Sequence, residues 1–367
     1  MITVLALASL LFQDKPEIIA IKGGRVLTMS AAGELEGATI LIADGRIKAI
    51  GKNVDVPMDA TLIELPKTAV VVPGFIDAHS HLASVFEIEE ATESVTPHVK
   101  AIEAFASQHR DVRDALSSGV TLVAVAPGNG NLVGGRVALV RMNGRRLDRM
   151  IVSDSAAVKL SLGDEALRRD REPTSRTGAL RLLRDLLRDP GDVKRSLVER
   201  RELALIHASG PGDIARALEI KESANLNVVL VHAFGAKDLA SRIKDASVPV
   251  AFGPLTAADP RDRLEAPAAL AKAGVKLAFV TDAPATAESQ LRETAALAVK
   301  YGLDRQDALR ALTIGAAEIL GVGSRFGILD AGREADVVVY SGDPLSLASA
   351  VELVVVEGRI VHRKPKK

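Results

Sequence analysis

Histidine and aspartate residues follow apolar runs at several separate places in this sequence. His79 and His81 come directly after the run 74–78, His207 follows the run 203–206, and His232 follows the run 228–231. Asp282 stands two positions beyond the run 276–280. Neutral imidazole and carboxylate are ligands that zinc and other first-row divalent ions take in proteins. The pattern therefore predicts a metal site, and a bound metal ion activates water for hydrolysis at neutral pH.

These side chains require elements that bring their positions together. In an extended segment, residues i and i+2 point to the same face, so His79 and His81 can reach one ion. Near-continuous apolar runs, which are typical of parallel strands covered on both faces, occur at 74–78, 120–125, 157–162, 203–206, 228–231, 248–252 and 276–280. Residues 136–140 and 150–152 compete for the place of the third strand.

Amphipathic stretches, for example 177–188 and 212–223, separate several of these runs. The alternation of strand and helix predicts a parallel α/β fold, and two architectures satisfy it: a (β/α)₈ TIM barrel or an open doubly wound sheet. In a barrel the carboxyl ends of the strands converge on one face, where active sites are built. A barrel would therefore gather the four histidines and Asp282 around one pocket.

The hydrophobicity pattern is different at both ends of the chain, where short alternating runs are separated by turn residues. The N-terminal part has such runs at 18–21, 24–27, 38–42 and 45–51, with turn signals at Gly23-Gly24 and Asp44-Gly45. The C-terminal part has a strand at 336–340 and a tight hairpin over 353–361. These patterns indicate antiparallel strands. Since neither part is large enough to fold alone, we expect the two to pair into one module.

Composition narrows the class of protein further. The 367 residues are 47% hydrophobic, and 47 basic residues balance 47 acidic ones, which excludes general disorder and a global attraction to nucleic acid. Cysteine is absent, so disulfides, thiolate metal sites and a cysteine nucleophile are excluded. The glycine-rich stretch 127–135 lacks the Gly-Lys-[Ser/Thr] of a phosphate-binding loop, and it is either a loop that borders the site or a plain turn.

On these residues the chain resembles the amidohydrolase superfamily of metal-dependent hydrolases, nearest to its imidazolonepropionase-like branch. The resemblance extends over about 18–362, and its most specific segments are 72–81, 281–284, 311–321 and 327–339. It implies a (β/α)₈ barrel over 73–325 beside a composite β-sandwich formed by 17–72 and 326–367. It also implies metal-ligand roles for His79, His81, His207, His232 and Asp282.

The fourth strand of such barrels supplies a further ligand, often a carboxylated lysine that bridges two ions. Lys159 is the best positional match, and a lysine within a buried strand needs an explanation of this kind. The alternatives are that Lys159 extends its amine to the barrel rim, or that Asp164 supplies the ligand. Glu165 is one position out of phase for this role. We therefore expect a divalent metal, zinc by preference, as one ion or as two bridged by carboxylated Lys159.

The residue types predict hydrolysis by metal-activated water, and the resemblance implies that the bond cleaved is a non-peptide C–N bond in a linear or cyclic amide. Asp282 would act as the general base and then as the acid, and His232 would act as a ligand or assist at the carbonyl oxygen. The alternatives are a metallo-dipeptidase or deacetylase on the same barrel, a deaminase, or a non-catalytic barrel that binds a metal or ligand. We expect a small-molecule amide as the substrate and no nucleic-acid partner. The sequence leaves open whether the protein forms a homo-oligomer.

Residues 1–16 form a leader-like segment with an apolar run of about eleven residues, well short of the roughly 18 that span a bilayer. It resembles the apolar part of a secretory signal. However, no Lys or Arg precedes it, and the small-residue site at 6–8 comes early. The sequence thus leaves open whether the protein is cytoplasmic or exported to the periplasm, and it predicts no transmembrane segment.

Overall fold

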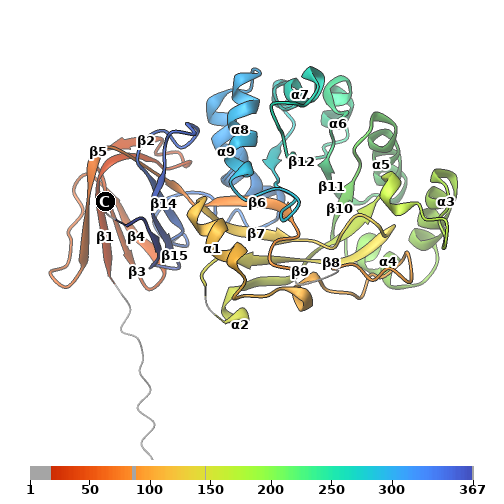
Figure 1. The fold of residues 1–367 in the computed structure, drawn as a ribbon, viewed down its shortest axis with the longest axis horizontal. Coiled ribbons are helices and arrows are strands. Elements are labelled where there is room, and N and C mark those ends of the chain that lie inside the picture. The colour runs from red at the N-terminus through yellow and green to blue at the C-terminus, as the bar shows by residue number, and fades with distance from the viewer. Residues whose placement is uncertain (1–17, 85–87, 145, 366–367) are drawn as a thin grey trace, which may run out of the picture.

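The computed structural model describes residues 18–84, 88–144 and 146–365, and the predicted leader 1–16 lies outside these ranges (Figure 1). A β module occupies the left of Figure 1, and a larger body of strands with helices on its outer side occupies the centre and right. Among the described residues, no helix combines the length and apolar character that crossing a membrane requires.

The β module is one eight-stranded mixed sheet that draws on both ends of the chain. Its strands are β1 (Ile19–Leu27), β2 (Glu34–Glu36), β3 (Thr39–Ala43), β4 (Arg46–Gly51), β5 (Thr61–Pro73), β14 (Val337–Tyr340), β15 (Val351–Val356) and β16 (Arg359–Arg363). The order is β16-β15-β14-β5-β1-β3-β4, with β2 beside β1, and β14 runs antiparallel to β5. One apolar cluster includes residues from both ends, such as Ile19, Ile40, Val337 and Val355. The predicted pairing of the two ends is therefore present.

One predicted turn in this module is wrong. Gly23-Gly24 does not separate two strands but forms an irregularity inside β1, where the pairing with β5 shifts between Gly23 and Arg25. Both glycines have positive φ, and a Cβ on either would lie within 2.7 Å of a carbonyl oxygen of β5. These glycines therefore permit a close backbone approach within the sheet, a role that the sequence signal of a turn resembles. The turn at Asp44-Gly45 is present between β3 and β4.

The larger body holds the second eight-stranded sheet, in the order β13-β12-β11-β10-β9-β8-β7-β6. Its strands are β6 (Phe75–Ser80), β7 (Val120–Val125), β8 (Val133–Arg141), β9 (Ile151–Ser161), β10 (Leu203–His207), β11 (Asn227–His232), β12 (Val250–Phe252) and β13 (Leu277–Phe279). β13 also contacts β6, and the backbone N–H of His81 donates to the carbonyl of Ala283 at 2.7 Å. The sheet thus nearly closes into a barrel, and the open doubly wound alternative is wrong.

The expectation of an all-parallel (β/α)₈ barrel is wrong at one strand. β8 runs antiparallel to both β7 and β9, whereas the other neighbouring strands of this sheet are parallel. The connection from β7 to β8 is a short loop without a helix, and such a connection joins antiparallel neighbours. Of the two runs that competed for the third strand, 136–140 lies in β8 and 150–152 leads into β9.

The helices follow the strands as the amphipathic pattern predicts, and several lie on the outer side of the barrel in Figure 1. They are α1 (Arg110–Ser117), α2 (Leu147–Met150), α3 (Arg176–Arg188), α4 (Asp192–Lys194), α5 (Pro211–Ala224), α6 (Ala240–Asp245), α7 (Arg261–Lys272), α8 (Gln290–Lys300), α9 (Arg305–Ala311) and α10 (Ile314–Ile319). Short helical turns add η1 (Ala101–Ala104), η2 (Asp164–Ala166), η3 (Arg195–Glu199) and η4 (Lys237–Leu239).

A buried ion cluster joins the barrel to the β module. Arg141, the last residue of β8, donates from Nε to both carboxylate oxygens of Asp336 at 3.1 Å, and from Nη1 to Glu334 at 3.1 Å. Both acidic residues come from the segment that leads into β14. All three side chains are less than a tenth exposed, so each charge depends on its partners for compensation.

Candidate metal centre

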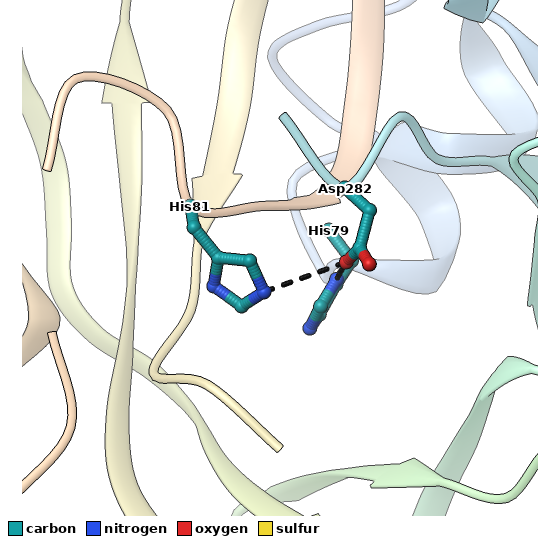
Figure 2. Close-up of side chains that lie close together, drawn as sticks. All are labelled: His79, His81 and Asp282. Atoms are coloured by element: carbon teal, nitrogen blue, oxygen red, sulfur yellow. Dashed lines mark ion pairs between the residues drawn. The ribbon is translucent and has the colours of Figure 1, made fainter. Parts of the chain in front are cut away.

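The predicted site residues meet at the carboxyl ends of the parallel strands. His79 lies in β6 and His81 just after it, while His207 and His232 end β10 and β11. The Asp282 carboxylate oxygen Oδ1 lies 3.1 Å from His79 Nδ1, 3.4 Å from His81 Nε2 and 3.6 Å from His232 Nε2. Figure 2 shows the His79, His81 and Asp282 side chains pointing toward one another. Three imidazoles from two strands thus surround one carboxylate oxygen.

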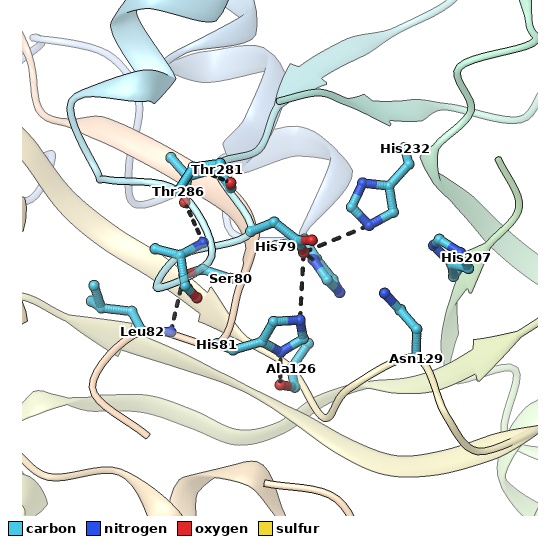
Figure 3. Close-up of polar contacts among 12 residues, drawn as sticks. His79, Ser80, His81, Leu82, Ala126, Asn129, His207, His232, Thr281 and Thr286 are labelled. Atoms are coloured by element: carbon cyan, nitrogen blue, oxygen red, sulfur yellow. Dashed lines mark hydrogen bonds and ion pairs between the residues drawn. The ribbon is translucent and has the colours of Figure 1, made fainter. Parts of the chain in front are cut away.

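His207 joins the same group through the neighbouring ring. The ring centroids of His207 and His232 are 4.8 Å apart, and those of His232 and His79 are 5.4 Å apart. In Figure 3 the side chains of all four histidines and of Asn129 border one region. The structure therefore brings together His79, His81, His207, His232 and Asp282, as the barrel hypothesis requires.

Backbone carbonyls fix the orientation of two of the rings. Nδ1 of His81 lies 2.8 Å from the carbonyl oxygen of Ala126, and Nδ1 of His232 lies 2.8 Å from that of Gly253. A carbonyl oxygen only accepts hydrogen bonds, so each Nδ1 carries the proton and donates it. The other ring nitrogen, Nε2, faces Asp282 in both residues, which is the arrangement found in histidines that bind metals.

Lys159 projects from β9 into the same region. Its side chain is fully buried, and Nζ lies 2.6 Å from His79 Nε2 and 2.6 Å from Asn129 Oδ1. The amine is therefore at the site and not at the barrel rim. Burial lowers the pKa of Lys159 from 10.5 to about 8.

Burial also controls the protonation of the histidines. It lowers the pKa of His232 to about 4 and, with the charge of Lys159 added, the pKa of His79 well below its ordinary value. Both rings are therefore neutral near pH 7, as metal ligation requires. Burial of Asp282 acts to raise the pKa of its carboxyl, but the His79 and His81 rings outweigh it and hold that pKa far below the usual range.

Several buried atoms of this group lack an aligned hydrogen-bond partner: His79 Nδ1, His232 Nε2, Asp282 Oδ1 and both ring nitrogens of His207. Buried polar atoms are nearly always hydrogen-bonded, so a cluster of unpaired donors and acceptors needs an explanation. The ligand atoms of His79, His81 and Asp282 all lie within 4.8 Å of one another, which suits a single ion. The donor set of imidazole nitrogen and carboxylate oxygen fits a first-row divalent metal.

Two buried acidic residues near the histidines, Asp77 and Glu288, were not predicted from the sequence. Asp77 Oδ1 accepts hydrogen bonds from the backbone N–H groups of His79, at 3.1 Å, and Thr281, at 3.2 Å, and its other oxygen contacts the Thr281 hydroxyl. Asp77 thereby connects β6 to the segment that carries Asp282. Its signal in the sequence is a charged residue inside the apolar run 74–78. Burial raises the pKa of Asp77 to about 7 and, together with the Asp77 charge, raises that of nearby Glu288 well above its ordinary value.

The two acidic residues that follow β9 behave differently from the expectation. Asp164 is three-quarters exposed and pairs with Arg176 at 2.7 Å, so it does not supply a ligand to this centre. Glu165, which we expected to be out of phase, places its Oε2 3.3 Å from His207 Nε2. The η2 turn causes this, because it rotates the chain away from the strand alternation on which the expectation depends. The interaction with His207 lowers the pKa of Glu165 to about 2.

The backbone at two of the site residues adopts an uncommon conformation. His232 and Asp282 have φ values of 68° and 62°, in the left-handed region that residues other than glycine seldom occupy. Such conformations cost about 1–3 kcal/mol each and persist where the surrounding structure enforces them, often at functional sites. The two residues lie at the end of β11 and after β13, and their side chains approach each other to 3.6 Å.

Comparison with known proteins is consistent with this geometry. Residues 193–361 match the family described as "Amidohydrolase family". The crystal structure of an amidohydrolase from Thermotoga maritima MSB8 is 30% identical, with a TM-score of 0.87 over 94% of this chain and 100% of that one. An imidazolonepropionase from Maricaulis maris is 25% identical over 86% of this chain and 91% of its own length.

The amidohydrolase tasK from Hapsidospora irregularis is 24% identical over 87% of this chain, which spans 39% of that longer relative. The match to the Thermotoga maritima structure covers nearly the whole of both chains and includes the barrel and the β module alike. This chain therefore belongs to the amidohydrolase superfamily, and it is a hydrolase that acts on carbon–nitrogen bonds.

Proposed function

We propose that this protein is a metal-dependent amidohydrolase that cleaves a non-peptide C–N bond in a small linear or cyclic amide. The observation that carries the proposal is the position of Asp282 Oδ1, which lies within 3.6 Å of imidazole nitrogens from His79, His81 and His232. Members of this superfamily generally use divalent metals. The similarity to an imidazolonepropionase favours a cyclic amide among the substrates to test first.

We infer that one or two divalent ions, Zn²⁺ by preference, are held by the residues His79, His81, Lys159, His207, His232 and Asp282. When bound, such an ion activates water as a nucleophile at neutral pH and polarises a carbonyl oxygen. The donors that the chain offers, neutral rings and an ionised carboxylate, need no proton removed before they bind a cation. The near-neutral pKa of Lys159 makes its free amine accessible at moderate pH, which is the form that carboxylation by CO₂ requires.

Asp282 is the group that moves the proton in this mechanism. Its Oδ1 lies between the ring nitrogens, and the residue is partly exposed, with 23% of the side chain accessible. The carboxylate can therefore accept a proton from water in the pocket and return it to the leaving nitrogen, as general base and then acid. His232 donates from Nδ1 to the carbonyl oxygen of Gly253, so Nε2 of the neutral ring is an acceptor that faces Asp282, which suits the role of a metal ligand.

The β module has a supporting role in this proposal. We infer that residues 17–72 and 326–367 form a composite β-sandwich and that 73–325 form the barrel. The shared apolar cluster of the two ends supports this division, and the buried pair of Arg141 and Asp336 connects the two parts. The module would thereby hold the base of the barrel while its opposite face carries the site.

The test is hydrolysis by the Zn²⁺-loaded enzyme of a panel of lactams, hydantoins, N-acyl amino acids and dipeptides, with wild type and Asp282→Asn compared. We expect turnover of an amide in the first three classes and a decrease in kcat of about 10²–10⁴-fold in the variant, since that is the usual contribution of a general base. Turnover of dipeptides alone would indicate a metallo-dipeptidase. Metal binding without any turnover would indicate a non-catalytic barrel, and full activity in Asp282→Asn would refute the role of the carboxylate.

A further inference from the structure

Glu288 is a buried carboxyl that the proposed reaction does not use. It lies in the segment between Asp282 and helix α8, and it is only 4% exposed. Its Oε1 lies 3.5 Å from the hydroxyl oxygens of both Ser80 and Thr281, whereas its Oε2 is buried and has no hydrogen-bond partner. Ser80 belongs to β6 and Thr281 follows β13, so Glu288 faces the seam at which the barrel closes.

Both hydroxyl groups have nearer acceptors for their protons than Glu288. The Thr281 hydroxyl donates to Asp77 Oδ2, and the Ser80 hydroxyl donates to the carbonyl oxygen of Ala283 at 3.2 Å. Each hydroxyl oxygen also accepts a backbone N–H, at 3.1 Å in Thr281 and at 3.0 Å in Ser80. A hydroxyl has one proton and two lone pairs. One lone pair on each oxygen therefore remains for Glu288, which can fill it only if its carboxyl carries a proton.

An ionised carboxylate at position 288 would lie near charges of its own sign. Burial and the nearby charges of Asp77 and Asp111 raise the pKa of Glu288. Asp111 is itself paired with His109 at 3.1 Å, at the start of α1. A buried charge without a partner is costly, whereas a carboxylic acid is neutral and supplies one O–H donor. The protonated form of Glu288 therefore fits the hydroxyl groups around it.

We propose that Glu288 is a neutral carboxylic acid, which donates its proton to the hydroxyl groups of Ser80 and Thr281 and thereby positions Asp282. Thr281 directly precedes Asp282, and Ser80 stands between two of the histidines, so the contact joins the two segments that carry the proposed ligands. Asp282 has a φ of 62°, a conformation that the surrounding structure must enforce. Glu288 is thus a positioning residue, and the inference rests on the proposed function, in which Asp282 moves the proton.

The first measurement is the infrared spectrum of the metal-free, full-length protein near neutral pH, because the C=O stretch of a protonated carboxyl is separate from that of a carboxylate. Glu288→Gln places a neutral amide there, which can donate an N–H in place of the O–H. Glu293→Gln, in the first turn of α8, is the matched control. We expect a protonated-carboxyl band that is lost in Glu288→Gln and unchanged in the control. A band that persists in Glu288→Gln overturns the proposal.

The second measurement is Zn²⁺ affinity by calorimetric titration, together with kcat on the amide that wild type hydrolyses. Glu288→Leu is added here, since leucine is similar in size and has no donor. We expect Glu288→Gln to keep both values within about threefold and Glu288→Leu to lose at least about tenfold in each, because a misplacement of about 1 Å at a reacting group can cost about 10²-fold. Equal losses in the two variants, or wild-type values in Glu288→Leu, overturn the positioning role.

Circular dichroism verifies that each variant is folded. Should Glu288→Leu not fold, Ser80→Ala takes its place, because it removes one of the two acceptors of the Glu288 proton and leaves the acid intact. A wild-type protein that binds Zn²⁺ but hydrolyses no amide overturns the proposed function. The infrared band and the Zn²⁺ affinities then still decide whether Glu288 is protonated and whether it positions Asp282.

Discussion

The buried amine of Lys159 makes the stability of the metal-free protein depend on pH in a way that can be isolated. Its pKa is about 8 in the folded protein and 10.5 in an unfolded chain. Between these values the unfolded state binds more protons than the folded state, so the free energy of unfolding rises with pH. The cost of burying the charged amine is complete below pH 8 and absent above pH 10.5.

The size of this effect follows from the two pKa values. Their difference is about 2.5, and each pKa unit corresponds to 1.36 kcal/mol, so the cost amounts to about 3 kcal/mol. Lys159→Met removes the titrating group and keeps most of the side-chain volume. The variant also loses the contacts with His79 and Asn129, but this loss adds a nearly constant offset over the pH range. The difference in stability between the two proteins should therefore change by about 3 kcal/mol.

The assay is urea denaturation of both metal-free proteins at several pH values from 7 to 10.5, in bicarbonate-free buffer so that the amine stays unmodified. Other groups titrate alike in both proteins and cancel in the difference. We expect wild type to gain about 3 kcal/mol relative to Lys159→Met as the pH rises through this window. A difference that stays constant would show that Lys159 keeps its ordinary pKa, and it would refute the assignment of a buried, readily neutralised amine.

Two further predictions concern the ion cluster and the metal. Arg141→Met should lower the free energy of unfolding by about 3–5 kcal/mol, because it leaves Asp336 buried without its cation, while Glu334 keeps its pairs with Arg46 and Arg325. Arg181→Ala, at an exposed pair on α3, should change it by about 1 kcal/mol or less, and equal effects in urea denaturation would contradict this reasoning. Removal of metal with a chelator should lower Tm, and free Zn²⁺ at 100 times its Kd should restore about 2.7 kcal/mol to the free energy of unfolding. A Tm that responds to neither treatment would contradict a metal site formed only in the folded state.

The features that could be predicted from the sequence are those that follow from one local pattern, such as an apolar run that ends at a polar residue. Apolar runs followed by His207, His232 and Asp282 indicated strand ends, and strand ends in a barrel share one face, so the meeting of these residues was predictable. The pairing of the chain ends was predictable for a related reason, since neither set of short strands could bury its apolar face alone.

The remaining features depend on contacts that no local pattern encodes. The apolar run of β8 is compatible with either strand direction, and only the short connection from β7 makes it antiparallel. Glycine pairs mark turns and bulges alike, so Gly23-Gly24 was ambiguous until its partner strand was known. Glu165 reaches His207 through a single helical turn, which breaks the two-residue alternation used to judge its phase.

The same contacts between the first and last barrel strands close the barrel and assemble the site. His79 belongs to the first barrel strand and Asp282 follows the last, and the backbone N–H of Asp282 lies 3.4 Å from the carbonyl oxygen of His79. Asp77 joins the same two segments through the N–H of Thr281. An ion bound by His79 and Asp282 would therefore hold the seam of the barrel and bind the closed form alone. Metal binding should for this reason stabilise the whole barrel, and loss of the seam contacts should weaken the metal site as much as loss of a ligand.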